Sequence, residues 1–242
     1  MICKLCDQEA ELQYSHIIPE HVYGKLYDDK HRYSGITLEG DTKLEQKGLR
    51  EKLLCRECEQ MLNDKYEKYF STFWISGKAL PDTTTADAIT ITVSDYIKFK
   101  LYMLSILYRA SISSLNTFSG VALGVHESRI KNMLIKGFDC EYYSIFGTVI
   151  CNSDNKIENR IIIPPCRKRY DGHIVYQIIF SGCAWYIKIS NHRCHDIQEF
   201  CLKPNGQLQL TVDKMHEFAE IINIHNTLTS KGNGKTEQTQ EQ

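Results

Sequence analysis

The stretch LLCRECEQMLNDKYE, residues 53–67, joins a Cys-x-x-Cys pair to a segment with helical periodicity. A second pair lies at the start of the chain in MICKLC, residues 1–6. A two-residue spacer lets both thiolates of a pair reach one ion at about 2.3 Å, and two pairs complete a tetrahedral shell. We therefore predict one structural zinc ion held by Cys3, Cys6, Cys55 and Cys58. Four unrelated buried cysteines are the alternative.

The segment after the second pair has two neighbouring helical stripes. The first stripe is apolar or thiol-bearing and contains Cys55, Cys58, Leu62 and Tyr66. The second stripe is polar and contains Glu59, Asn63 and Glu67. The polar stripe either faces solvent or supplies oxygen ligands to a divalent cation.

Upstream, LQYSHIIP at residues 12–19 alternates as a half-buried strand does, and its proline ends the pattern. We expect one face of this strand to carry Leu12, Tyr14, His16 and Ile18. If one zinc ion gathers both cysteine pairs, the strand lies near the helix and His16 faces Glu59 and Asn63. An imidazole beside oxygen ligands of a hard cation is typical of a hydrolytic site. A satisfied core histidine is the alternative.

A Cys-x-x-Cys pair, a His-Ile-x-Pro-like strand and a Cys-x-x-Cys pair that opens a helix resemble the HNH (ββα-metal) nucleases in their zinc-stapled form. The resemblance covers about residues 1–70. It implies that His16 is the general base, and that Asn63 and Glu59 hold a catalytic Mg²⁺ or other divalent cation. Ser15 stands where the family usually has an Asp or His ligand. Extra waters, or an acid such as Glu20, would then complete the shell, or the site is weak.

The two halves of this module are separated by a segment, residues 25–52, that we interpret as an insertion. Its KLEQKGLREK run, together with the next arginine, offers five candidate phosphate contacts: Lys43, Lys47, Arg50, Lys52 and Arg56. A solvated helix face is the alternative interpretation of this run.

The fold class that we predict is α+β, with an HNH-like zinc-bound module at residues 1–75 and an α+β domain with an antiparallel sheet at 89–230. We expect helices at 95–113, capped by Ser94 or Asp95, and at 126–137. Strands follow at 142–151, 159–166, 173–182 and 183–191, then a hairpin at 200–210. A last helix begins near Thr211–Asp213, and residues 231–242 form a disordered tail.

Two further segments of the second domain are ambiguous. NHRCHDIQEFC, with Cys183 nearby, could form a second metal site, although buried cysteines are the more ordinary interpretation; its candidate ligands are His192, Cys194, His195 and Cys201. The basic loop CRKRYDGH, residues 166–173, either contacts a phosphate backbone or is an exposed turn.

Composition narrows the functional class. The 242 residues carry a net charge of −1, which provides no global basic field, so a nucleic-acid surface must be local. No secretory signal is evident. In the most hydrophobic segment, residues 95–113, the longest uncharged run is residues 101–108, which is far shorter than the about 20 residues of a bilayer span. Ten cysteines without a signal favour reduced thiols and metal binding. We expect a cytoplasmic protein that does not enter a membrane.

The functional prediction is a metal-dependent endonuclease acting on DNA, with RNA as an alternative substrate. By analogy at the level of the family, such a protein would serve bacterial restriction or anti-phage defence. The competing hypothesis is a non-catalytic zinc-binding module that docks nucleic acid or protein. A third is an adaptor whose activity needs a partner subunit of a defence system, such as an ATPase.

Overall fold

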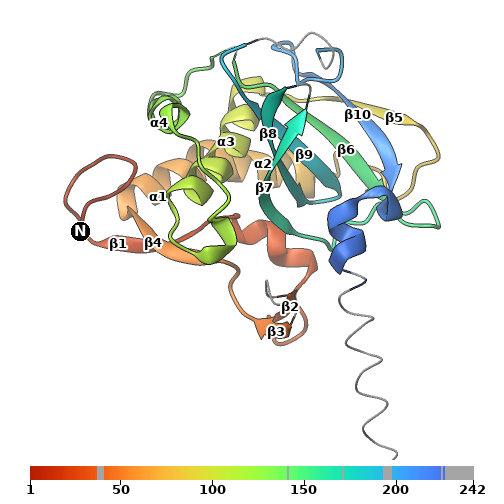
Figure 1. Cartoon of the computed structure of the whole chain (residues 1–242), viewed down its shortest axis with the longest axis horizontal. Coiled ribbons are helices and arrows are strands. Elements are labelled where there is room, and N and C mark those ends of the chain that lie inside the picture. Colours follow the sequence, from red (N-terminus) through yellow and green to blue (C-terminus); the bar gives the residue numbers. More distant parts are fainter. Residues whose placement is uncertain (37–40, 141, 171, 193–197, 225, 227–242) are drawn as a thin grey trace, which may run out of the picture.

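The computed structural model describes residues 1–36, 41–140, 142–170, 172–192, 198–224 and 226 (Figure 1). Strands β1 (Leu12–His16) and β4 (Arg50–Cys55) pair antiparallel, and α1 (Arg56–Leu62) starts directly after β4. Glu57 and Glu59 lie in the first turn of α1, where carboxylates complement the helix dipole. The helical path continues through two π-helical turns (Asn63–Glu67 and Ser71–Ser76) and α2 (Lys68–Phe70).

The segment between β1 and β4 forms a small lobe of its own. It contains a 3-10 helix (Glu20–Lys25) and the two-stranded antiparallel sheet of β2 (Tyr33–Ile36) and β3 (Thr42–Glu45). Figure 1 shows this lobe below the β1–β4 hairpin, away from the large sheet.

Two further helices cover the hairpin and the sheet. Asp95 caps the N-terminus of α3 (Tyr96–Ile112), because its carboxylate accepts from the Lys98 amide at 3.0 Å. Most residues of α3 are buried. α4 (Val125–Lys136) ends at Gly137, whose φ of 72° is the left-handed conformation that glycine adopts without strain. None of the helices in the described ranges combines the length and apolar character that crossing a bilayer requires.

The second half of the chain builds a six-stranded mixed sheet. In spatial order its strands are β5 (Ala88–Thr92), β10 (Gln207–Lys214), β6 (Ile145–Cys151), β9 (Cys183–Ile189), β8 (His173–Phe180) and β7 (Ile163–Tyr170). The expected α+β class is confirmed, but the expected antiparallel sheet is wrong at one place. β10 pairs parallel with β6, because the chain returns after a long excursion from β9 and enters between β5 and β6.

Three local expectations also need correction. Residues 88–92, where no strand is predicted ahead of the helix at 95–113, form strand β5. Thr211–Asp213 do not begin a helix but extend β10, so that helix starts only at 219. The basic residues Arg167, Lys168 and Arg169 lie on strand β7 rather than in a loop. The predicted tail at 231–242 lies outside the described residues.

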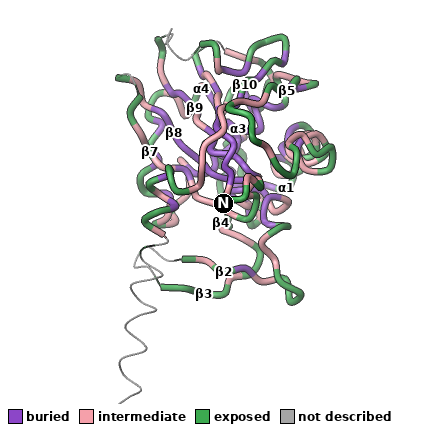
Figure 2. Tube along the Cα trace, turned by 90° about the vertical axis from the view of Figure 1, so that its right-hand side faces the viewer, coloured by how far each residue is buried: buried purple, intermediate pink, exposed green. Residues whose placement is uncertain are grey.

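One hydrophobic core contains residues from the hairpin, the helices and the sheet, including Leu54, Phe70, Tyr102 and Trp185. Phe70 stacks on Tyr102 at 4.1 Å, and Trp74 meets Trp185 edge-on at 4.9 Å. Figure 2 shows the buried trace running through the middle of the molecule, whereas β3 is largely exposed. The division into units at 1–75 and 89–230 stays a prediction, and this core joins both ranges.

Candidate metal centre and adjoining histidine

The structure brings together Cys3, Cys6, Cys55 and Cys58, whose sulfur atoms all lie within 4.8 Å of one another. Cys6 Sγ is 3.8 Å from Cys55 Sγ, too far for a disulfide bond and close to the about 3.8 Å edge of a tetrahedron with 2.3 Å Zn–S bonds. Three of the four are buried, and the Cys55 amide donates to Cys3 Sγ at 3.2 Å. The four thiols fit a structural metal ion such as zinc, and among the described residues no other group of potential ligands is this close.

The electrostatics of these thiols also favour a cation. Burial raises the pKa of Cys3, but backbone N–H groups of Cys6, Cys55 and Leu5 outweigh it and lower that pKa to about 7. Burial raises the pKa of Cys55 to about 11 and raises that of Cys58 further. Cys55 and Cys58 therefore lose their protons near neutral pH only when a bound cation compensates their charge.

His16 ends β1, and its ring is held from the side of the small lobe. Nε2 lies 2.7 Å from the carbonyl oxygen of Lys47, which can only accept, so Nε2 carries the proton in the neutral ring. The same nitrogen is 2.7 Å from Glu20 Oε2, which is within ion-pair distance. The geometry of this contact does not make a hydrogen bond to Oε2. Within the described residues nothing hydrogen-bonds to Nδ1, so its lone pair is available as a base.

Glu20 is itself held in place by two aromatic neighbours. Its Oε1 accepts from the Tyr27 hydroxyl at 2.5 Å and lies 3.5 Å from His31 Nε2, whose ring stacks on Tyr27. Burial of Tyr27 raises the pKa of its hydroxyl, and the hydrogen bond to Glu20 raises it further. The acid considered as a substitute ligand therefore does lie beside His16.

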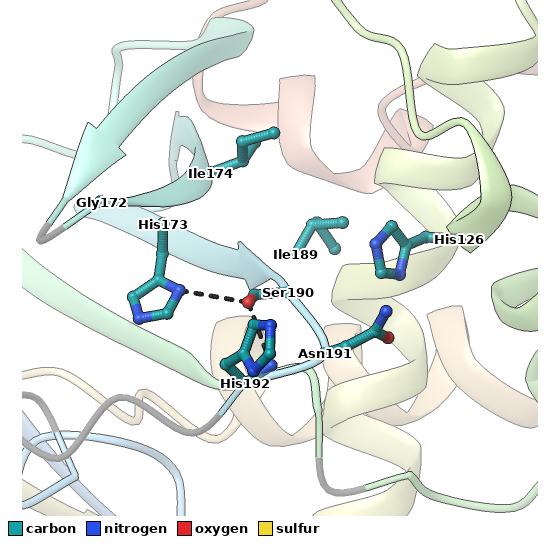
Figure 3. Close-up of a pocket in the computed structure, with 8 residues that line it drawn as sticks. All are labelled: His126, Gly172, His173, Ile174, Ile189, Ser190, Asn191 and His192. Atoms are coloured by element: carbon teal, nitrogen blue, oxygen red, sulfur yellow. Dashed lines mark hydrogen bonds between the residues drawn. The ribbon is translucent and has the colours of Figure 1, made fainter.

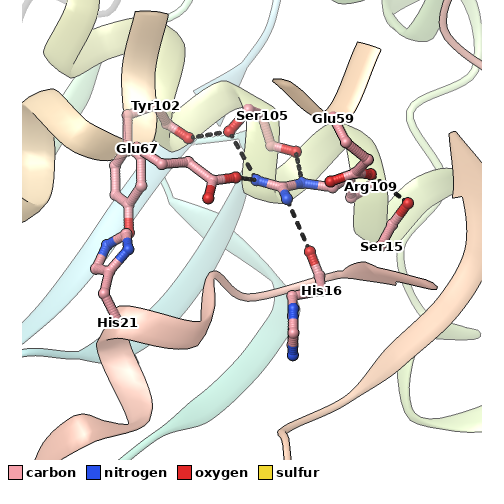
Figure 4. A network of polar contacts seen from close by, with 8 residues as sticks. All are labelled: Ser15, His16, His21, Glu59, Glu67, Tyr102, Ser105 and Arg109. Carbon is pink, nitrogen blue, oxygen red and sulfur yellow. Dashed lines mark hydrogen bonds and ion pairs between the residues drawn. The ribbon is translucent and has the colours of Figure 1, made fainter. Parts of the chain in front are cut away.

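The predicted juxtaposition of His16 with Glu59 and Asn63 is wrong. Figure 4 shows the His16 ring pointing away from the helix carboxylates, and the buried hydroxyl of Ser15 donates to Glu59 instead. Asn63 lies one turn further along on a half-buried position, and among the hydrogen bonds of the described residues that involve a side chain, those of His16 go to Lys47 and Arg109.

A buried arginine occupies the space between the strand and the helix (Figure 4). Arg109 is 1% exposed, and its guanidinium donates to Glu67 Oε1 at 2.7 Å and to the His16 carbonyl at 2.8 Å. Burial lowers its pKa, but the charges of Glu67 and Glu59 outweigh burial and raise it. A permanent cation thus already offsets one of the stripe's two negative charges, and among the described residues Glu59 belongs to no group of three or more His, Cys, Asp or Glu ligands.

Apart from Lys43 on β3, the predicted phosphate contacts lie on the hairpin and its flanks. Arg50 is the cross-strand partner of His16, and Arg56 is exposed at the start of α1. Lys47, with a φ of 64°, sits in the turn before β4 and offers its carbonyl to His16. Arg50 therefore shares a face with His16, because directly opposite residues of an antiparallel pair project to the same side.

The candidate second metal site is not formed by the described residues. His192, Cys183 and Cys201 do not group as ligands, and Cys194 and His195 lie outside the described ranges. His192 instead lines a pocket of about 410 Å³ with His126 and His173 (Figure 3). His126 Nδ1 contacts the Tyr143 hydroxyl at 3.0 Å, and His173 Nδ1 contacts Ser190 Oγ at 3.1 Å.

Arg109 and His31 are absent from the sequence-based site. His31 lies in the segment interpreted as an insertion, and Arg109 belongs to the apolar run taken as a buried helix. The one available signal was the arginine itself, since a lone charge within a buried helix requires a partner. Comparison of the chain with family models, curated proteins and solved structures finds no match.

Proposed function

We propose that this chain is a zinc-stapled endonuclease of the HNH type that hydrolyses phosphodiester bonds of DNA. The observation that carries the proposal is His16, whose Nε2 proton is committed to the Lys47 carbonyl, while nothing in the described residues hydrogen-bonds to Nδ1. Arg50 is the cross-strand partner of His16 and projects from the same face. The strand–strand–helix order around the four cysteines supports the same assignment. Restriction or anti-phage defence, a defence-system partner and a cytoplasmic location belong to this proposal.

In this mechanism Nδ1 of His16 takes a proton from water while the water oxygen attacks phosphorus in line. The bond to the 3′ oxygen breaks as the new P–O bond forms, and the leaving oxygen takes a proton from solvent. Glu20, 2.7 Å from Nε2, stabilises the imidazolium that results. Arg50 offsets charge on the phosphate. No step is routed through a divalent cation, because among the described residues no group of three His, Cys, Asp or Glu ligands gathers beside His16.

Nicking of supercoiled plasmid by the zinc-loaded chain tests this proposal. Reactions with no added divalent cation, with Mg²⁺ and with Mn²⁺ are compared without a chelator, because a chelator would also remove zinc. His16→Ala should lower the rate roughly 10²–10⁴-fold, the usual contribution of a general base. His192→Ala, remote from the hairpin, is the matched control and should cut normally. Full activity of His16→Ala would refute the assignment.

Two carboxamide variants locate the acidic partner. Glu20→Gln should slow cutting because the imidazolium loses its neighbouring charge, whereas Glu59→Gln should leave the rate much less affected. The reverse order would restore Glu59 to the site.

A second candidate function is a non-catalytic docking module or adaptor. The observation that favours it is the guanidinium of Arg109 between Glu67 and the His16 carbonyl, where the predicted cation site was expected. Retained DNA binding without cutting under any of the three metal conditions would favour this candidate. Cutting that appears only when a partner subunit is added would identify an adaptor.

A further inference from the structure

The outer face of the β1–β4 hairpin carries an exposed aromatic ring. Tyr14 is 58% exposed, although it belongs to a strand with buried neighbours on its inner face. Tyr14 pairs with Lys52 and His16 pairs with Arg50, so these four side chains project from one face. Ser15, between them, projects inward to Glu59.

Two cations lie over this ring. Arg50 Cζ lies 5.1 Å and Lys52 Nζ 5.3 Å from the Tyr14 ring centroid. The acid between them, Glu51, turns to the opposite face, where Ser113 Oγ donates to it at 2.7 Å and the Ser114 amide at 2.9 Å. Across the described part of the chain, neither cation has a carboxylate within ion-pair distance.

We propose that Tyr14 is a stacking platform for an unpaired base of single-stranded DNA, with Arg50 and Lys52 binding the flanking phosphates. The inference rests on the proposed function and names its substrate class. An aromatic ring in contact with two uncompensated cations is suited to bind a nucleotide, because the base offers a π-face to the ring and the phosphates offer negative charge to the cations. The faces of paired bases are covered within a duplex, so only an unpaired base can use the ring.

The same face leads to the candidate base. His16 is two residues from Tyr14 on β1, a distance of about 7 Å along the strand. A base stacked on Tyr14 therefore positions the adjacent phosphate near Arg50 and His16, while the β1–β4 strand pair stays as it is. The sites of binding and cleavage then form one continuous strip.

Binding is measured with the full-length, zinc-loaded chain and no added divalent cation, by fluorescence anisotropy of a labelled 12-nucleotide DNA strand and of its duplex. Tyr14→Ala should weaken single-strand binding about 5- to 150-fold, the range of one base–aromatic stack. Tyr14→Phe should retain binding because the ring remains. Duplex binding should be unchanged by either variant but weakened by Arg50→Ala.

Tyr142→Ala is the matched control, because Tyr142 is similarly exposed and lies under Arg129 on another surface. A 2-aminopurine base in the strand gives direct evidence of stacking: its emission should fall with wild type and Tyr14→Phe, but not with Tyr14→Ala. Unchanged single-strand binding by Tyr14→Ala, or an equal loss on strand and duplex, would overturn the proposal. Tighter binding of the same RNA sequence would overturn DNA as the ligand.

These outcomes are separable from the proposed function. Plasmid nicking that persists while Tyr14→Ala binds single strands normally refutes the stacking platform alone. Tyr14-dependent binding by a chain that never cuts DNA refutes the endonuclease and supports the platform.

Discussion

Glu67→Gln should destabilise the protein strongly, because it removes the main counter-charge of a buried arginine. Arg109 is 1% exposed and the Glu67 side chain 14% exposed, with 2.7 Å between Nη2 and Oε1. Two unit charges about 4 Å apart attract by about 4 kcal/mol at an effective dielectric constant of 20. Breaking a buried pair by removal of one partner typically costs about 3–5 kcal/mol.

The structure places this variant at the lower end of that range. The introduced carboxamide would keep a hydrogen-bond acceptor, and the His16 carbonyl and Glu59 still face the guanidinium. We therefore expect a loss of about 3 kcal/mol in the free energy of unfolding, or about 6–12 °C in Tm.

Urea denaturation of the zinc-saturated protein measures this loss. Asp64→Asn is the matched control on the same helical path, since Asp64 pairs with Lys68 at 2.5 Å but both side chains are well exposed. That exposed pair should contribute far less, because solvent screens it. If Glu67→Gln and Asp64→Asn lose similar amounts, Arg109 does not depend on Glu67 and the electrostatic account of the site fails.

Three further predictions concern the metal, pH and a turn. Elemental analysis should find one zinc per chain in the wild type and in Cys151→Ser, but little in Cys55→Ser, which should also unfold at lower temperature. Burial lowers the pKa of His21 to about 4, so between about pH 6.5 and pH 4 the unfolded chain binds a proton that the native state does not bind. The free energy of unfolding should therefore fall as pH drops through this range. Urea titrations should show a shallower fall in His21→Gln. Gly206→Ala should lower Tm by several degrees, because its φ of 86° suits glycine and a Cβ would lie 2.2 Å from the Val93 carbonyl oxygen; an unchanged Tm would contradict this.

The sequence was informative where the determinant is local. Two Cys-x-x-Cys spacings sufficed to group the four thiols, and the apolar run from Tyr96 sufficed for a buried helix. The sequence pattern gave the wrong prediction where one irregular residue changes which side chains of strand β1 face inward and which face outward. The register shift between Gln13 and Tyr14 leaves Leu12 buried but turns Tyr14 and His16 outward and Ser15 inward. A period of two read from Leu12 therefore assigned His16 to the wrong face.

Long-range placement was equally hidden. The parallel contact of β10 with β6 depends on where a distant strand enters the sheet, which no local pattern encodes. Arg109 reaches the strand of His16 from a helix far along the chain, and its meeting with Glu67 exists only once α3 packs against the helical path.

The position of Arg109 also decides where hydrolysis could take place. A divalent ion about 5 Å from a guanidinium would be repelled by about 7 kcal/mol at an effective dielectric constant of 20. Arginine does not lose its proton to relieve this repulsion, and Glu67 is already engaged. The outer face presents His16 beside Arg50 and Tyr14, with Glu20 Oε2 2.7 Å from the His16 ring. Chemistry at this hairpin is therefore favoured on the face turned away from the helix, where a bound strand would lie.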